Sequence, residues 1–246
     1  MRIRGLSRIQ KSESGVKDPG HSSSAIRPAN SGKPCNEWTG AAPRRIDTRF
    51  CDLLGPVAWN SLPPAVRARF SKVLAPGAAR IFAGAVTETR LSGAGRLLAR
   101  FAQLAGGPLP TTDGATGPAT VVVREDATLG GQVWTRTYTR PGRFPQTINS
   151  VKRFSGPTGL EEYLGAGLVM RLNLHAEAGA LVFRSAGYDL VLGSVRLPLP
   201  RVLAPGHCAI THRADGPDRF SFTLTLDHPW LGRLATQVAH FEETPS

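Results

Sequence analysis

The chain has 246 residues, of which 41% are hydrophobic and 20% are charged, and its formal net charge is +12. These values suffice for one domain with a substantial core, and they exclude collagen-like, coiled-coil and low-hydrophobicity disordered chains. No stretch approaches the roughly 18 to 20 apolar residues that a membrane-spanning helix needs. The cysteines, Cys35, Cys51 and Cys208, form neither a disulfide framework nor a zinc-binding pattern, and we expect free thiols.

The positive charge is spread along the chain and consists mainly of arginine. Residues 1–49 hold 10 basic and 4 acidic residues, and residues 50–246 hold 20 and 14. Arginine accounts for 25 of the 30 basic residues. Such an excess is typical of proteins that bind nucleic acid or anionic lipid, but nucleic-acid binders usually concentrate their charge in one stripe or helix. Because the arginines are dispersed along the sequence, we do not expect a nucleic-acid partner.

The N-terminal segment differs in composition from the rest of the chain. Residues 1–48 are rich in Ser, Gly and Pro and show no apolar periodicity, so we predict a disordered basic tail there and a single β-rich domain over 49–246. The tail lacks the apolar core of a secretory signal, and its acidic residues argue against a transit peptide. Upstream sequence included through a misplaced start codon is the other interpretation. Without an export signal, we expect a cytoplasmic protein.

Two helices and a strand are predicted before residue 119. A helix over 61–75 begins at Ser61, which can cap it, and ends before a Pro-Gly pair. A period-two pattern then predicts a strand over 80–90. Apolar residues recur next at helical spacing, with arginines opposite, which predicts an amphipathic helix with one buried stripe. The stripe consists of Ala94, Leu97, Leu98, Phe101, Leu104 and Ala105.

From residue 119 onward the hydrophobic pattern has mostly period two, with turns that contain Gly and Pro between the apolar runs. No helix is predicted in this part, which excludes a parallel sheet with helical crossovers. The predicted fold class is therefore α+β and mainly β. It combines one or two N-terminal helices with a meander of about eight or nine antiparallel strands that form a curved sheet or a barrel.

The best candidate for a binding site lies on one predicted strand. Trp134, Arg136 and Tyr138 share a strand face, and on a concave sheet they would provide aromatic walls with a cation between them. Small ligands are usually held by such mostly apolar sites with few polar groups. Glu162 is the expected partner of Arg136 or of Arg153. The alternative is that both aromatics belong to the core and that Arg136 lies along them through its aliphatic stem.

Known catalytic and cofactor motifs are missing from the sequence. There is no phosphate-binding loop, no complete dinucleotide fingerprint and no nucleophilic serine elbow. The six histidines do not show the spacing of a zinc site. We therefore assign no cofactor, no metal and no catalytic residue from the sequence.

The segment Leu197-Pro198-Leu199-Pro200 has an unusual alternation of proline and leucine. Proline favours an extended chain but cannot donate the hydrogen bonds of a regular ladder, so the segment is interpreted as an edge or barrel-closing piece. The alternative is a flap over a cavity mouth, or a hydrophobic contact that includes Val202 and Leu203.

Four short motifs stand in order over about residues 53–242. They are Leu54-Gly55-Pro56 with Leu62-Pro63-Pro64-Ala65-Val66-Arg67, Trp134-Thr135-Arg136-Thr137-Tyr138, Leu197-Pro198-Leu199-Pro200-Arg201-Val202-Leu203-Ala204-Pro205, and Leu231-Gly232-Arg233-Leu234. In this order they resemble the bacterial domain-of-unknown-function family 4166, and Glu162-Tyr163-Leu164-Gly165 resembles an acidic-aromatic-glycine segment of that family. The resemblance implies no established activity. Because members of the family stand alone or follow dehydrogenase-like domains, it implies a separate oxidoreductase as a partner.

The sequence leads to three hypotheses about function. The first is a cup-shaped binder of a small hydrophobic or amphipathic ligand, with Trp134, Arg136, Tyr138, Glu162 and Tyr163 as ligand-binding residues. The second is an isomerase- or cyclase-type enzyme that uses Glu162 or a histidine as the acid–base group in the same cup. The third is an accessory interaction module for a separate oxidoreductase, which an exposed apolar patch would favour.

Overall fold

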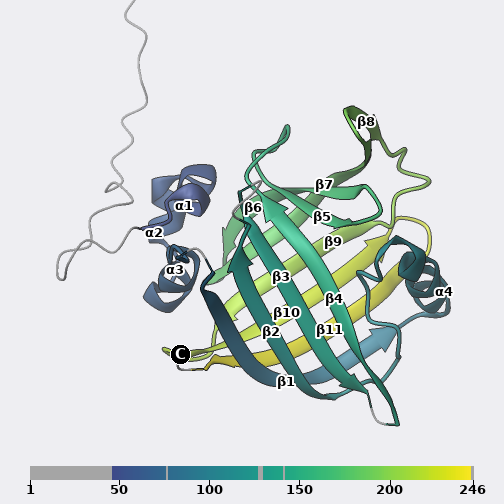
Figure 1. Ribbon diagram of the computed structural model, residues 1–246, viewed down its shortest axis with the longest axis horizontal. Coiled ribbons are helices and arrows are strands. Elements are labelled where there is room, and N and C mark those ends of the chain that lie inside the picture. The colour runs from purple at the N-terminus through teal and green to yellow at the C-terminus, as the bar shows by residue number, and fades with distance from the viewer. Residues whose placement is uncertain (1–45, 76, 127–129, 141, 245–246) are drawn as a thin grey trace, which may run out of the picture. The chain divides into compact units, whose positions relative to one another are not determined.

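Antiparallel strands dominate the computed structural model, which describes residues 46–75, 77–126, 130–140 and 142–244 (Figure 1). The strands are β1 (Ala79–Leu91), β2 (Gly117–Glu125), β3 (Gln132–Arg140), β4 (Arg143–Arg153), β5 (Glu161–Gly165), β6 (Leu168–Glu177), β7 (Ala180–Leu192), β8 (Val195–Pro198), β9 (His207–Ala214), β10 (Arg219–His228) and β11 (Gly232–Glu243). In space they follow the order β6-β5-β4-β3-β2-β1-β11-β10-β9-β7, and pairing of β6 with β7 closes a ten-stranded barrel. β8 pairs with β7 outside this ring.

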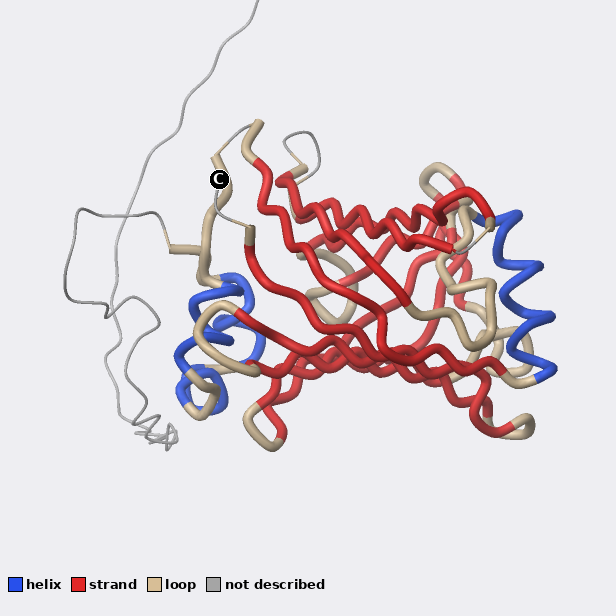
Figure 2. The backbone as a smooth tube through the Cα atoms, turned by 90° about the horizontal axis from the view of Figure 1, so that it is seen from below, coloured by secondary structure: helices blue, strands red, loops and turns tan. Residues whose placement is uncertain are grey.

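Helices stand at both ends of the barrel. α1 (Arg49–Leu54), α2 (Pro56–Asn60) and α3 (Pro64–Phe70) precede β1, whereas α4 (Gly93–Ala102) follows β1 and continues into a 3₁₀ turn at Gln103–Ala105. Figure 2 shows α1 to α3 at one end of the barrel and α4 at the other. We call these the α1–α3 end and the α4 end.

Aromatic side chains fill the barrel at the α1–α3 end. Phe50 of α1 and Phe70 of α3 pack against Phe183 of β7, with ring centroids 6.1 and 5.8 Å away. His212 of β9 lies 5.3 Å from the Phe70 ring. All four side chains are buried, so this end of the barrel is closed by a packed aromatic core.

The predicted mainly β fold with helices towards the N-terminal side is confirmed, and of the two predicted forms the barrel is the one observed. The strand predicted over 80–90 corresponds to β1. The helix predicted over 61–75 is shorter and ends at Phe70. Ser71 follows it as the C-cap, and Lys72 then forms an isolated antiparallel bridge with Ile46.

The helix predicted over 94–105 corresponds to α4 and its 3₁₀ turn, but the expectation of one fully buried stripe is wrong. Leu97, Phe101 and Leu104 of that stripe are exposed. The helix approaches the barrel through its smallest side chains instead. A Cβ atom at Gly95 would lie 2.0 Å from the carbonyl oxygen of Leu234, so the helix backbone rests almost directly on β11.

The predicted tail lies almost entirely outside the described residues, which begin at Ile46. Within the described part, Asp47 is buried and its carboxylate accepts hydrogen bonds from the Arg49 guanidinium at 2.9 and 2.7 Å. The expectation of free thiols is correct for Cys208, which is free and buried. It is wrong for Cys51, which is disulfide-bonded.

Candidate functional site

The inner face of β3 carries the predicted set of two aromatic side chains and a cation. Trp134 and Tyr138 are buried, and the Arg136 side chain is 11% exposed. Because successive side chains of a strand point to opposite faces, the intervening Thr135 and Thr137 point outward. The three predicted residues therefore share one face, and this face lines the interior of the barrel.

Glu162 of β5 is the centre of a buried charge cluster that spans the neighbouring strands β3, β4 and β5. Its Oε1 accepts hydrogen bonds from the Ser150 hydroxyl at 2.6 Å and from Arg136 Nη2 at 3.1 Å. Its Oε2 lies 3.0 Å from the ammonium nitrogen of Lys152, which is buried as deeply as Glu162. Lys152 and Glu162 form an ion pair and Arg136 adds a second cation, so positive charge exceeds negative charge in this part of the barrel.

The protonation of Glu162 follows from these contacts. Burial alone would raise the pKa of a carboxyl group, but the charges of Lys152 and Arg136 and the Ser150 hydrogen bond lower the pKa of Glu162 to about 2. Burial lowers the pKa of Lys152, and the facing carboxylate opposes that effect. At neutral pH Glu162 is therefore an ionised acceptor with no proton to donate.

A cavity of about 150 Å³ lies inside the barrel beside this charge cluster. Arg136, Tyr138 and Glu162 form part of its wall. The rest of the wall is mainly apolar, and it includes Leu109, Ile148, Met170, Phe222, Leu224 and Leu226. The cavity thus combines a hydrophobic wall with a charged patch on one side.

α4 covers this cavity by crossing the open end of the barrel. Gly95, near the start of the helix, touches the backbone of Leu234 in β11, and Gly106, just after the helix, faces the Leu164 carbonyl of β5. β5 and β11 are five strands apart in the ring of ten, so the helix spans the opening from one side to the other. Leu98 of α4 projects into the cavity lining. α4 is therefore the cover of the cavity.

The structure brings four of the five predicted ligand-binding residues together. Arg136, Tyr138 and Glu162 line the cavity, and Trp134 lies deeper, beside a small adjoining space that Arg136 and Tyr138 also line. The Trp134 ring is covered by the Lys152 ammonium at 4.8 Å from the ring centroid. This cation–π contact helps to pack Trp134 into the core, which was the second interpretation of the aromatic side chains on β3.

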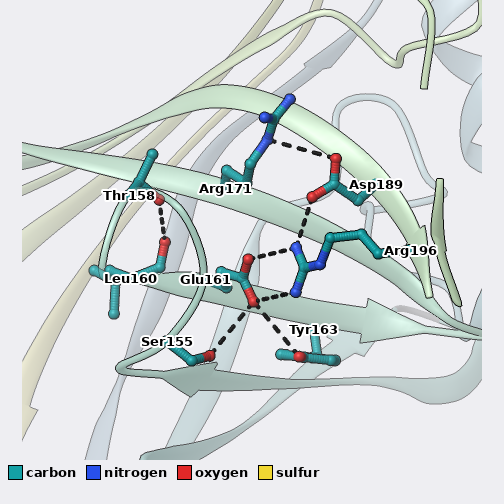
Figure 3. A network of polar contacts seen from close by, with 8 residues as sticks. All are labelled: Ser155, Thr158, Leu160, Glu161, Tyr163, Arg171, Asp189 and Arg196. Atoms are coloured by element: carbon teal, nitrogen blue, oxygen red, sulfur yellow. Dashed lines mark hydrogen bonds and ion pairs between the residues drawn. The ribbon is translucent and has the colours of Figure 1, made fainter. Parts of the chain in front are cut away.

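Tyr163, the fifth predicted residue, points to the opposite face of β5 from Glu162 and does not line the cavity. Its hydroxyl lies 3.5 Å from Glu161, in a polar cluster outside the barrel wall (Figure 3). There Arg196 of β8 bridges the buried carboxylates of Glu161 and Asp189, with contacts of 2.6 Å to each. The cluster fastens β8 to the barrel, which agrees with the edge interpretation of the Leu-Pro segment.

Two members of the buried charge cluster were not predicted from the sequence, and both lie on β4. On this strand Ser150 and Lys152 point into the barrel, whereas the apolar Val151 between them points outward. This arrangement inverts the usual alternation of apolar and polar residues, so period-two analysis did not identify the inner face. The only local signal is a lysine in a segment otherwise suited to a strand.

Few other reactive groups reach the cavity. Cys208 lines it, but burial raises the pKa of this thiol to about 12, so the thiol stays protonated. Among the residues that the structure describes, no cluster of three or more metal-ligating side chains occurs. The same part of the chain contains no helix that is both long and apolar enough to cross a membrane.

Comparisons with known proteins identify a family and no characterised relative. A family model described as "Domain of unknown function (DUF4166)" matches residues 62–241. No curated protein and no solved structure matches the chain. The match covers β1 to β10 completely and most of β11, and therefore includes every residue of the cavity wall named above.

Proposed function

The chain belongs to the DUF4166 family, and we propose that this member binds a small hydrophobic or amphipathic ligand in the cavity beneath α4. The observation that carries the proposal is the cavity inside the barrel with its apolar wall and single charged patch. Ligand sites are typically concave, mostly apolar and equipped with a few polar groups that orient the ligand.

The size of the cavity limits what it can take up while α4 is in place. An apolar cavity of roughly 150 Å³ accepts a molecule about as large as benzene. A larger ligand would therefore need α4 to move, or would extend through the opening beside the helix. We expect a single ring or the end of a short aliphatic chain in the space that the structure encloses.

The charged patch favours a ligand with a negative or strongly polar end. Arg136 faces the cavity and gives only Nη2 to Glu162 and Ser150. Because cations exceed anions in the cluster, a carboxylate or sulfonate beside Arg136 would balance the buried charge. An amphipathic anion is therefore preferred over a neutral compound of the same length.

The acid–base enzyme alternative has one observation in its favour, since Glu162 is buried at the cavity wall. However, a general base is most effective when its pKa lies near the working pH, and the pKa of Glu162 is lowered to about 2. His212, the buried histidine nearby, does not line the main cavity. The contacts therefore favour binding over acid–base catalysis.

We further propose that the protein is cytoplasmic. We also propose that a separate oxidoreductase is its partner and uses the bound ligand.

A displacement assay with the full chain tests the proposal. The probe is 1-anilinonaphthalene-8-sulfonate, whose fluorescence rises in apolar surroundings, and the competitors are octanoic acid and octanol. We expect both competitors to displace the probe and octanoic acid to do so at lower concentration. Leu224→Trp, which places an indole in the cavity, should weaken probe binding at least tenfold.

The matched control is Thr225→Trp on the same strand, since Thr225 points away from the cavity that Leu224 lines. It should bind the probe as the unmodified chain does. Equal probe binding by both tryptophan variants, or a failure of both competitors to displace the probe, would show that the cavity is not the binding site.

A further inference from the structure

The cover helix α4 exposes an apolar stripe that nothing in the described structure covers. Leu97, Phe101 and Leu104 are 55%, 63% and 84% exposed, and each lies about one turn from the next. Arg96 and Arg100 lie beside this stripe on the same exposed side of the helix. A helix in a globular protein normally buries its apolar stripe, so the exposed stripe points to a contact with something outside the barrel.

Two neighbouring connections at the same end of the barrel also expose apolar side chains. Trp230 is exposed in the turn between β10 and β11, directly before the segment on which Gly95 of α4 rests. Val202 and Leu203 are exposed in the connection from β8 to β9. That connection meets the end of β10, because a Cβ at Gly206 would lie 2.5 Å from the Asp227 carbonyl oxygen. We call the six exposed residues the mouth surface: Leu97, Phe101, Leu104, Val202, Leu203 and Trp230.

The two ends of the barrel carry opposite net charge. Arg196 and Glu161 contact each other at 2.6 Å and are counted at neither end. At the α4 end, the described residues of the connections and the strand ends beside them include seven arginines and two aspartates, within 90–117, 140–145, 192–194, 199–207 and 227–233. At the α1–α3 end they include eight basic and nine acidic residues, within 46–79, 124–132, 153–160, 177–180, 213–219 and 242–244. The mouth surface is therefore set in a strongly basic rim, and the opposite end is slightly acidic.

We propose that the α4 end docks on the surface of a lipid bilayer that contains anionic lipids. Aliphatic and aromatic side chains of the mouth surface would enter the head-group region, and the surrounding arginines would contact lipid phosphates. Aliphatic side chains such as Leu97, Leu104 and Leu203 gain from hydrocarbon but offer nothing to a nucleic acid, which would be bound through charge and stacking. The combination of exposed aliphatic residues and excess arginine thus fits an anionic membrane surface.

Docking at this end goes beyond the proposed ligand binding and does not depend on it. The same helix supplies Leu98 to the cavity wall and Leu97 to the mouth surface. A docked protein would therefore hold its cavity opening at the depth where hydrophobic molecules dissolve in the membrane. The two properties are tested separately, because a filled cavity leaves the mouth surface unchanged.

Vesicle flotation with the full chain tests the docking. Vesicles of phosphatidylcholine alone are compared with vesicles that contain about 30% phosphatidylserine, a composition that gives the surface the negative charge on which the arginines act. We expect at least tenfold stronger binding to the anionic vesicles, and a marked loss of binding in 0.5 M salt. Leu224→Trp, the cavity-filling variant, should bind the vesicles normally, so that failure of docking and failure of ligand binding are distinguishable.

Paired variants locate the contact. Phe101→Ser should weaken binding to the anionic vesicles more than tenfold, whereas Val57→Ser, at a 62% exposed site of the α1–α3 end, should change it less than twofold. Arg100→Gln should weaken it about fivefold, and Arg124→Gln at the α1–α3 end less than twofold. Every variant keeps residues 1–45, so the charges of that segment contribute equally to all measurements.

Three results would overturn the proposal. The first is equal binding of the unmodified chain to both kinds of vesicle. The second is a Phe101→Ser variant that binds as well as Val57→Ser. The third is a chain that ignores vesicles but forms an oligomer that Phe101→Ser dissociates, which would assign the mouth surface to a protein interface instead.

Discussion

Replacement of Glu162 by glutamine should destabilise the barrel strongly, because it would leave two cations buried without their anion. Lys152 and Arg136 approach the carboxylate to 3.0 and 3.1 Å, and Glu162 is 1% exposed. Removal of one partner from a buried ion pair typically costs about 3–5 kcal/mol. The pKa gives a second measure, since a fall from the ordinary value of 4.5 to about 2 corresponds to roughly 3 kcal/mol. We therefore expect Glu162→Gln to lower the free energy of unfolding by about 3 kcal/mol.

The pH dependence separates this effect from a simple packing defect. The pKa of Glu162 is lower in the folded state, so the unfolded state takes up a proton first as the pH falls. The stabilisation is fully present above pH 4.5 and disappears as the pH falls towards 2. Glu162→Gln should lack this part of the acid destabilisation, and the difference in stability between the two proteins should shrink over that range.

Urea unfolding, followed by circular dichroism at a series of pH values, measures both quantities. The control is Glu242→Gln on β11, because Glu242 is exposed and its ion pair with Arg219 is 3.4 Å long, so a change below about 1 kcal/mol is expected. An unchanged m-value would show that the unfolding transitions are comparable. A loss below 1 kcal/mol for Glu162→Gln, or a difference that does not depend on pH, would refute this account of the cluster.

Three further changes test other parts of the structure. Burial and the charges of nearby cations lower the pKa of His212, so stability is lost as the pH falls below 6.5, and His212→Phe should reduce that loss in urea titrations at a series of pH values. Gly95→Ala should lower the melting temperature despite the better helix propensity of alanine, because its Cβ meets the Leu234 carbonyl, whereas Gly93→Ala, with open space around it, should not. Arg196→Met should lower the free energy of unfolding by roughly 1–2 kcal/mol in urea, since the buried Glu161 carboxylate loses its cation, whereas Asp189 keeps Arg171 at 3.6 Å and the exposure of Arg196 screens the pair.

The strand alternation was sufficient to predict the β-rich fold and to place Trp134, Arg136 and Tyr138 on one face of a strand. Which face of that strand lines the interior of the barrel was left open by the alternation and is visible only in the structure. β4 gave no such signal, because its inner face carries Ser150 and Lys152. Those two polar residues are tolerated inside because Glu162 on the neighbouring strand β5 accepts from both, with Lys152 and Glu162 paired in register, and the alternation of a single strand does not reveal such a cross-strand contact.

The orientation of α4 was not predictable from periodicity alone. The helical spacing of Leu97, Leu98 and Phe101 shows that they lie near one another on the helix. It does not show how much of the helix surface is buried by the rest of the protein. Gly95 allows the helix to sit so close to β11 that only a narrow strip of it is buried. Tyr163 illustrates the same limit on β5, where a shift of one residue from Glu162 moves a side chain to the other face of the sheet.

The topology of the barrel determines where the arginines, which are dispersed in the sequence, lie in space. In an antiparallel barrel, alternate connections meet at the same end, so Arg96, Arg143, Arg201 and Arg233 are brought to one rim although they are far apart in the sequence. The connections between them, at the α1–α3 end, carry most of the acidic residues of the described chain. A net charge that looks uniform along the sequence therefore becomes a polarity along the barrel axis. Because the basic end is also the end that α4 covers, charge, exposed apolar residues and access to the cavity all converge on one surface.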